Sequence, residues 1–210
     1  MKSEIYNIES KKIGDLTLNK SIFDTEYSAN LIAQAIRVHL FNQRSSYAKT
    51  KTRSQVAGTR KKVWSQKGTG NARHGNRTAP IFTGGGIALG PDGMQNYSLK
   101  MNKKMKKQAL NAVLTKFAKD KKILIIDDFS KLEPKTKIGL KLITGLKAAD
   151  SVLSKSKKIG VITDKTISPV KRAFGNIKSI SLLTLNSLNV YDLSNQNYLI
   201  FSQQAIEQLK

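Results

Sequence analysis

Apolar residues in the first part of the chain follow two kinds of pattern. The short runs Ile5–Ile8 and Ile13–Leu18 predict strands. A helix is predicted over residues 28–44 with Ser28 as its N-cap, because apolar side chains then recur at helical spacing, namely Leu31, Ile32, Ala35, Ile36 and Leu40. This part of the chain therefore predicts two strands followed by a helix.

The part after residue 100 alternates between helical and strand patterns. A helix is predicted over residues 102–119, where Met105, Ala109, Val113 and Phe117 recur every four positions. The runs Lys122–Asp127 and Lys158–Thr163 lack a polar face, as expected of strands buried on both sides. The remaining features are a helix over Thr136–Ala149, a short helix over Ser168–Gly175, apolar stretches at Ile177–Leu185 and Asn189–Leu193, and a run Tyr198–Phe201 before a helix over residues 202–209. This alternation predicts a three-layer α/β/α fold with a mainly parallel sheet.

Residues 45–93 interrupt that pattern. They contain nine basic residues against one acid, Asp92, and nine of the fourteen glycines, but only 13 hydrophobic residues in 49. A segment this poor in apolar surface does not offset its backbone ordering entropy of ~1–2 kcal/mol per residue. We therefore expect a single α/β domain over residues 1–210, with residues 45–99 inserted as an extended loop that is ordered by a partner.

Composition narrows the class of protein further. The chain has 210 residues, with 37 Lys and Arg against 14 Asp and Glu, and a formal net charge of +23. Cysteine is absent, which excludes disulfides, thiolate metal sites and a cysteine nucleophile. No apolar run approaches the ~18 residues of a membrane span, and the start Met1–Tyr6 fits neither a signal nor a transit peptide. We expect a cytoplasmic protein with a polyanion as its partner and no membrane association.

The basic residues of the loop and of the following helix are the candidate RNA-binding residues. Lys and Arg neutralise phosphates, and glycine lets the backbone approach a ligand closely. Four lysines crowd the first turns of the 102–119 helix, where the macrodipole favours negative charge, so a phosphate relieves the arrangement. The predicted set is Arg44, Lys49, Lys51, Arg53, Arg60, Lys61, Lys62, Trp64, Lys67, Gly68, Gly70, Arg73, His74, Arg77, Lys100, Lys103, Lys104, Lys106 and Lys107.

Two aromatic rings in this set admit two interpretations each. Trp64, the only tryptophan, either stacks on a base for ~1–3 kcal/mol or fills an apolar gap in the loop. His74 either contacts an RNA base or is a solvated side chain. His39, by contrast, continues the apolar face of the first helix and is predicted to be structural.

Candidate catalytic residues are few. Asp127–Asp128 and Thr163–Asp164 follow predicted strands at the edge where α/β folds bind ligands, although turn formation and capping by Asp are the favoured interpretation. There is no Walker-type phosphate motif, no Ser-His-Asp arrangement and no metal-spaced cluster. We therefore expect no catalysis, metal, cofactor or small-molecule substrate.

Three classes of function fit these features. A long irregular arm suits folded RNA, and no helix-turn-helix, zinc finger or basic zipper indicates DNA. The first class is thus a structural RNA-binding protein. The alternatives are an α/β enzyme acting on nucleic acid through Asp127 or Asp164, and a non-specific nucleic-acid packaging or regulatory protein.

One loop motif resembles a known family. Residues 52–75 contain Lys61-Lys62-x-Trp64-x-Gln66-Lys67-Gly68-Thr69-Gly70-x-Ala72-Arg73, which is similar to the signature loop of the bacterial large-subunit ribosomal protein four family. The likeness continues through Ala79–Phe82, Gly84–Gly86, Gly90-Pro91, Asn102–Lys104 and Pro134–Lys137. It covers essentially the whole chain, and its specificity lies in residues 52–107.

The resemblance implies more than the residues alone do. Members of that family bind large-subunit ribosomal RNA early in assembly, and their loop reaches the peptide exit tunnel, where it forms a constriction with another ribosomal protein. Some relatives also repress their own operon by binding its messenger leader. By resemblance, the tunnel-proximal residues are Arg60, Lys61, Lys62, Val63 and Trp64, and those that hold the loop's arms in RNA are Arg53, Lys67, Arg73 and Arg77. The implied partners are large-subunit ribosomal RNA, neighbouring ribosomal proteins at the tunnel and the messenger leader.

The chain departs from the family pattern at several loop positions. Val63 stands where Pro is frequent, Ser65 where a basic residue is common, and Asn71 where Arg is frequent. Asp92–Gln95 replaces a usual Pro-Arg pair. These changes lower the charge near the tip and leave Lys67–Gly70 intact.

Overall fold

The computed structural model describes residues 1–129 and 132–209. The chain divides into two compact units, Met1–His39 with Lys100–Lys210, and Leu40–Leu99. We call the first the body and the second the loop unit. Within the described residues, no helix is both long enough and apolar enough to cross a membrane.

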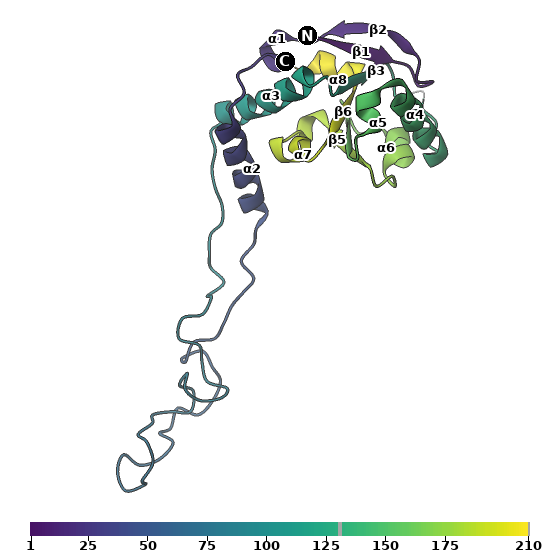
Figure 1. Ribbon diagram of the computed structural model, residues 1–210. Helices are drawn as coiled ribbons and strands as arrows, with labels where there is room; N and C mark the ends of the chain where they lie inside the picture. Colours follow the sequence, from purple (N-terminus) through teal and green to yellow (C-terminus); the bar gives the residue numbers. More distant parts are fainter. Residues whose placement is uncertain (130–131, 210) are drawn as a thin grey trace. The chain divides into compact units, whose positions relative to one another are not determined.

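A six-stranded sheet forms the centre of the body (Figure 1). Its strands are β1 (Lys2–Tyr6), β2 (Lys12–Thr17), β3 (Ile123–Ile126), β4 (Ile159–Thr163), β5 (Ile180–Thr184) and β6 (Tyr198–Ser202). They lie in the order β2-β1-β3-β6-β4-β5. Only the β1–β2 hairpin is antiparallel, and every other neighbouring pair is parallel.

Helices cover both faces of this sheet. They are α1 (Lys20–Phe23), α2 (Ala29–Gln43), α3 (Lys103–Lys119), α4 (Thr136–Ala149), α5 (Ser151–Ser154), α6 (Ser168–Phe174), α7 (Val190–Ser194) and α8 (Gln203–Gln208), with a short 3-10 turn at Leu185–Ser187. Figure 1 shows α4, α5 and α6 grouped beside the sheet, away from α3, α7 and α8. The predicted three-layer α/β/α fold with a mainly parallel sheet is confirmed.

The core consists of two apolar clusters, one on each face of the sheet. Ile123 and Ile125 of β3 point into the cluster formed with α1, α2, α3, α7 and α8. Leu124 and Ile126 alternate with them and point into the cluster formed with α4, α5 and α6. All four side chains are buried, which explains why this strand has no polar face.

A few helix and strand boundaries differ from those predicted from the sequence. The first strand ends at Tyr6 and not at Ile8, because Asn7 accepts the N–H of Lys11 (2.8 Å) in a turn with Ser10 at a φ of 64°. The apolar stretch at residues 189–193 forms α7, whose N-cap Asn189 accepts from the N–H of Asp192 (2.8 Å). The four-residue helices α1 and α5 were not predicted.

The loop unit contains more internal structure than its composition predicts. Between α2 and α3, both fully described, no regular helix or strand occurs, and the isolated bridges Lys49↔Asp92 and Lys62↔Asn76 are antiparallel. Lys49↔Asp92 and the bond from Thr50 N–H to the Pro91 carbonyl (2.8 Å) join two stretches that we call the outgoing arm (residues 44–77) and the return arm (residues 78–99). Lys62↔Asn76 and the bond from Val63 N–H to the Gly75 carbonyl (3.0 Å) lie within the outgoing arm, which therefore contains the turn at the tip.

Candidate nucleic-acid interface

Positive charge is confined to one arm of the loop unit. The outgoing arm carries ten Lys and Arg, whereas the return arm carries none and has Asp92 as its single charged residue. All ten cations are exposed, and in the described chain none of them forms an ion pair with a carboxylate. Exposed cations without carboxylate partners, distributed over the arm and both sides of its tip, present contacts for phosphates.

A few neutral contacts position cations near the tip. Lys62 donates through Nζ to the Gln66 side-chain oxygen (2.6 Å). The Arg60 guanidinium donates to the Ser54 carbonyl (3.0 Å). These bonds orient the long side chains without neutralising their charge.

Gly68 and Gly70 give the tip a backbone that other residues rarely adopt. Their φ angles are 83° and 66°, in the left-handed region that disfavours side chains with a Cβ. No other atom lies within 4 Å of where a Cβ would stand at either glycine. The Lys-Gly-Thr-Gly motif therefore sets the course of the chain through φ, not through internal crowding.

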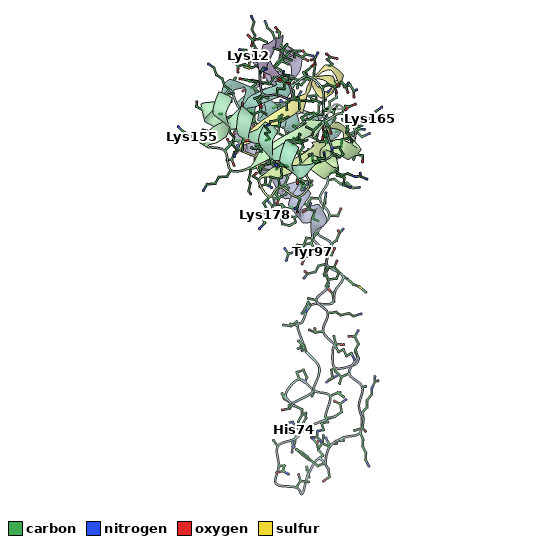
Figure 2. All side chains as sticks on the ribbon, turned by 90° about the vertical axis from the view of Figure 1, so that its right-hand side faces the viewer. Lys12, His74, Tyr97, Lys155, Lys165 and Lys178 are labelled. Atoms are coloured by element: carbon green, nitrogen blue, oxygen red, sulfur yellow. The ribbon has the colours of Figure 1, made fainter. Side chains whose placement is uncertain are left out.

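Three aromatic rings form a small cluster in the loop unit. The Trp64 and His74 rings meet edge to face with centroids 5.4 Å apart, and His74 meets Phe82 in the same way at 5.0 Å. Trp64 Nε1 donates to the Ala72 carbonyl (2.9 Å), and both Trp64 and His74 are half-buried. Figure 2 labels His74 within the loop unit. Trp64 therefore packs inside the loop, as one of its two interpretations expected, whereas the packing of His74 between two rings differs from the solvated side chain that was one of its own two.

Two glycines of the return arm, Gly86 and Gly90, lie against the outgoing arm without room for a Cβ. A Cβ on Gly86 would lie 2.3 Å from the Arg53 backbone nitrogen, and one on Gly90 would lie 2.0 Å from Thr50 Oγ1. Ile87 N–H donates to the Lys51 carbonyl (2.9 Å) at the same level. The return arm thus supplies small residues that let the cationic arm pair with it.

The base of the loop unit is held by contacts of Asn42 and Tyr97, which the sequence analysis did not single out. The Asn42 side chain accepts from the N–H of Leu99 (2.8 Å) and donates to its carbonyl (3.1 Å). The Arg44 guanidinium lies 4.1 Å from the centroid of the Tyr97 ring, which Figure 2 labels. A lone Asn or Tyr carries no sequence signal for such pairing, because its partner lies more than fifty residues away.

The lysines at the start of α3 lie where the sequence placed them. Lys100, Lys103, Lys104, Lys106 and Lys107 are all exposed on the body. Asn102 precedes α3 but makes no side-chain capping bond, and the first turn holds no acid. The positive end of this helix macrodipole is therefore not neutralised by a local carboxylate.

The candidate catalytic carboxylates do not form a cluster. Asp127 follows β3 and Asp164 follows β4, and β6 lies between those strands. Thr163 Oγ1 donates to the Lys165 carbonyl (2.8 Å), which is a turn contact. Among the described residues, no three of His, Cys, Asp and Glu gather in a way that would hold a metal ion.

His39 has the structural role predicted for it. Its ring stacks on Tyr191 of α7, with centroids 5.1 Å apart and planes inclined by 21°. The contact ties the end of α2 to α7 within the body.

An α/β body with an inserted cationic, glycine-containing hairpin is typical of a nucleic-acid-binding protein. The family comparison gives the particular family, because the model of the "Ribosomal protein L4/L1 family" matches residues 16–210. The chain belongs to this family.

Curated relatives agree over nearly the full length. The chain is 37% identical over 205 residues to "Large ribosomal subunit protein uL4" of Natranaerobius thermophilus, covering 98% of this chain and 95% of the relative. It is 34% identical to the protein of the same name from Lachnoclostridium phytofermentans (99% and 96% covered) and 35% identical to that of Lachnospira eligens (98% and 96% covered). The resemblance seen in the loop motif is confirmed. Membership of a family of structural ribosomal proteins decides against both the enzyme and the packaging alternatives.

Proposed function

We propose that this protein is a structural component of the cytoplasmic large ribosomal subunit and binds large-subunit ribosomal RNA through its loop unit. The observation that carries the proposal is the outgoing arm, where ten exposed cations lack carboxylate partners within the described chain. The relatives are named as proteins of the large ribosomal subunit, which supports the RNA of that subunit as the partner. The Lys and Arg side chains of the outgoing arm repel one another, and this repulsion is relieved when phosphates lie between them.

The proposal assigns different tasks to parts of the loop. Lys49, Lys51, Arg53, Lys67, Arg73 and Arg77 contact phosphates along the arm, with Arg44 at the base, and Gly68 and Gly70 let RNA approach the backbone. Arg60, Lys61 and Lys62 contact phosphates at the tip. The lysines at the start of α3, together with Lys100, add a second set of phosphate contacts on the body. The Trp64–His74–Phe82 cluster keeps the tip folded while RNA surrounds it.

The tip is proposed to reach the peptide exit tunnel. Arg60, Lys61, Lys62, Val63 and Trp64 would line the wall beside a loop of a neighbouring ribosomal protein. A photo-reactive residue in place of Lys61, in ribosomes stalled on a nascent peptide, should crosslink to that peptide. The same residue in place of Lys137 on α4 serves as the control, and equal crosslinking from both positions would contradict the tunnel assignment.

Operon control through the messenger leader is a separate part of the proposal. The same cationic arm would bind a leader whose fold imitates the ribosomal site. A reporter fused to that leader should be repressed when the protein is overproduced. Repression that persists in the Lys61→Gln, Lys62→Gln variant would show that another surface is responsible.

Salt dependence of RNA binding tests the central claim. Each phosphate contact contributes about 0.7 to 0.9 to the slope of log affinity against log salt concentration. The Lys61→Gln, Lys62→Gln variant loses two such contacts, so its binding to large-subunit RNA should depend less steeply on salt. The magnitude of the slope should fall by about 1.4 to 1.8. The matched control is Lys137→Gln with Lys165→Gln, which removes two exposed body cations. Equal slopes for wild type and the loop variant would refute phosphate contact at the tip.

A further inference from the structure

Three junctions between helices and strands meet at the amino edge of the body's sheet. They are residues 120–122 between α3 and β3, 155–158 between α5 and β4, and 195–197 between α7 and β6. The three strands are neighbours in the order β3-β6-β4, so the junctions lie side by side. Leu199 N–H donates to the Lys122 carbonyl (3.0 Å), and Asn197 N–H donates to the Lys158 carbonyl (2.9 Å). Segments far apart in sequence thus form one continuous surface.

The two outer junctions are rich in lysine and the central one is neutral. Together with the helical residues before them, these two junctions span residues 116–122 and 151–158, which contain one acid, Asp120, and seven lysines, namely Lys116, Lys119, Lys121, Lys122, Lys155, Lys157 and Lys158. Asp120 pairs with Lys122 at 3.0 Å. The central junction supplies hydroxyl and amide groups from Ser194, Asn195, Gln196 and Asn197. Cations on both sides of a neutral polar strip suit an anion with further hydrogen-bonding groups.

A cavity of about 440 Å³ opens at this place. Its apolar part is formed by Ile32 of α2 and by Val113 and Phe117 of α3, and Tyr27 lies beside them. Its polar part includes Lys116, Lys122 and Lys155. Lys116 Nζ lies 5.5 Å from the centroid of the Tyr27 ring, and Lys155 projects from the surface of the body in Figure 2. The volume falls within the ~300–1,000 Å³ of small-ligand sites.

The polar groups of the cavity are only partly engaged within the protein. The Asn197 side-chain oxygen accepts from the N–H of Lys158 (3.2 Å), which fixes that side chain at the wall. Gln196 Nε2 donates to the Asp192 carbonyl (3.2 Å), and its side-chain oxygen is buried without a hydrogen-bond partner among the described residues. After a rotation of its amide, this oxygen is an acceptor for an N–H of a nucleobase edge.

We propose that this pocket binds one unpaired nucleotide of RNA. The base lies against Tyr27 and Phe117, and the flanking phosphates contact Lys116, Lys122 and Lys155. Free phosphate would leave the apolar wall unused, and an apolar peptide would leave the lysines unused. The proposal rests on the proposed function that the chain binds RNA, and it adds a single-strand contact on the body to the loop's phosphate contacts. Asp127 and Asp164 do not oppose it, because they lie at the carboxyl edge of the sheet.

Titration of the full-length protein with tetra-adenylate RNA tests the pocket. Backbone amide NMR shifts should move at Lys122, Ser156 and Asn197. Tyr27→Ala, at a side chain that is 46% exposed, should weaken this response about tenfold through lost stacking. Lys116→Gln with Lys155→Gln should weaken it by a similar factor through lost phosphate contacts. The charge control is Lys137→Gln with Lys165→Gln, which should leave the affinity at this site unchanged.

Two outcomes overturn the assignment in distinguishable ways. If large-subunit RNA binds and Trp64 fluorescence responds, but the three amides do not move with tetra-adenylate, the pocket assignment alone is wrong. If neither RNA binds the wild-type chain, the proposed function fails together with the pocket. A fully paired RNA duplex that moves the same amides as strongly would refute the single-strand preference, because a paired base does not enter the pocket.

Discussion

Replacing Gly86 by Ala should uncouple the two arms of the loop unit without destabilising the body. A Cβ at this position would lie 2.3 Å from the Arg53 nitrogen and 2.5 Å from the Thr52 carbonyl carbon. Both neighbours are backbone atoms, so no side-chain rotation relieves the overlap. The arms must separate by about 1 Å, since ordinary contact begins near 3.4 Å.

That separation gives the expected magnitude. It breaks the bond from Ile87 N–H to the Lys51 carbonyl (2.9 Å), which joins the two arms beside Gly86. This bond contributes a net ~0.5–1.5 kcal/mol, so the pairing of the arms weakens by about that amount. If RNA binds the paired form, its affinity falls roughly 2-fold to 12-fold.

Filter binding to large-subunit RNA and thermal unfolding provide the two readouts. The matched control is Gly75→Ala, because no atom lies within 4 Å of a Cβ there and its φ is not positive. We expect the unfolding temperature of the body to be the same in both variants, since the arms form a separate compact unit. Equal RNA affinities for the two variants would show that arm pairing contributes nothing to binding.

Three further predictions follow from particular contacts. Trp64→Phe removes an indole donor and should weaken RNA binding roughly 2-fold to 12-fold by filter binding, so an unchanged affinity would contradict the packing role. Asp127→Asn combined with Asp164→Asn should leave both RNA binding and cell growth unchanged, and a growth defect in a folded variant would reopen the enzyme alternative. The hydrogen bond from Lys12 lowers the pKa of Glu4 below its ordinary 4.5, so its stabilisation is present above pH 4.5 and is lost as the pH falls through the lowered value. Urea midpoints at pH 7 and pH 3 should accordingly differ less for Glu4→Gln than for wild type, and an equal difference would argue against this linkage.

Much of the body was predictable because its elements bury regular apolar patterns. The helix over Thr136–Ala149 has the predicted bounds, and the β3 and β4 strands lie within the predicted runs. The errors occur where a polar side chain decides a boundary. Asn7 ended the first strand early, and Asn189 started a helix in a stretch too short to show a period.

The loop and the pocket depend on contacts between residues distant in sequence, which the sequence pattern did not predict. Charge on the outgoing arm is a property of composition and was readable from the sequence. Pairing of Thr50 with Pro91 depends on the register between segments about forty residues apart, and the contact of Trp64 with His74 accompanies the bond from Val63 N–H to the Gly75 carbonyl (3.0 Å). The pocket at the amino edge is lined by segments that are distant in sequence and adjacent only because of the strand order. No local sequence motif therefore predicts it.

The bonds between Asn42 and Leu99 also bear on how this molecule changes over evolutionary time. They bring the entrance and exit of the hairpin within hydrogen-bond distance, so the hairpin starts and stops at one place. Doubling a flexible segment closed in this way costs only about 0.6 kcal/mol more in closure entropy. Insertions and deletions between the two residues should therefore be tolerated by the remainder of the chain. Selection is free to adjust the reach of the hairpin residue by residue while the anchoring domain keeps its stability.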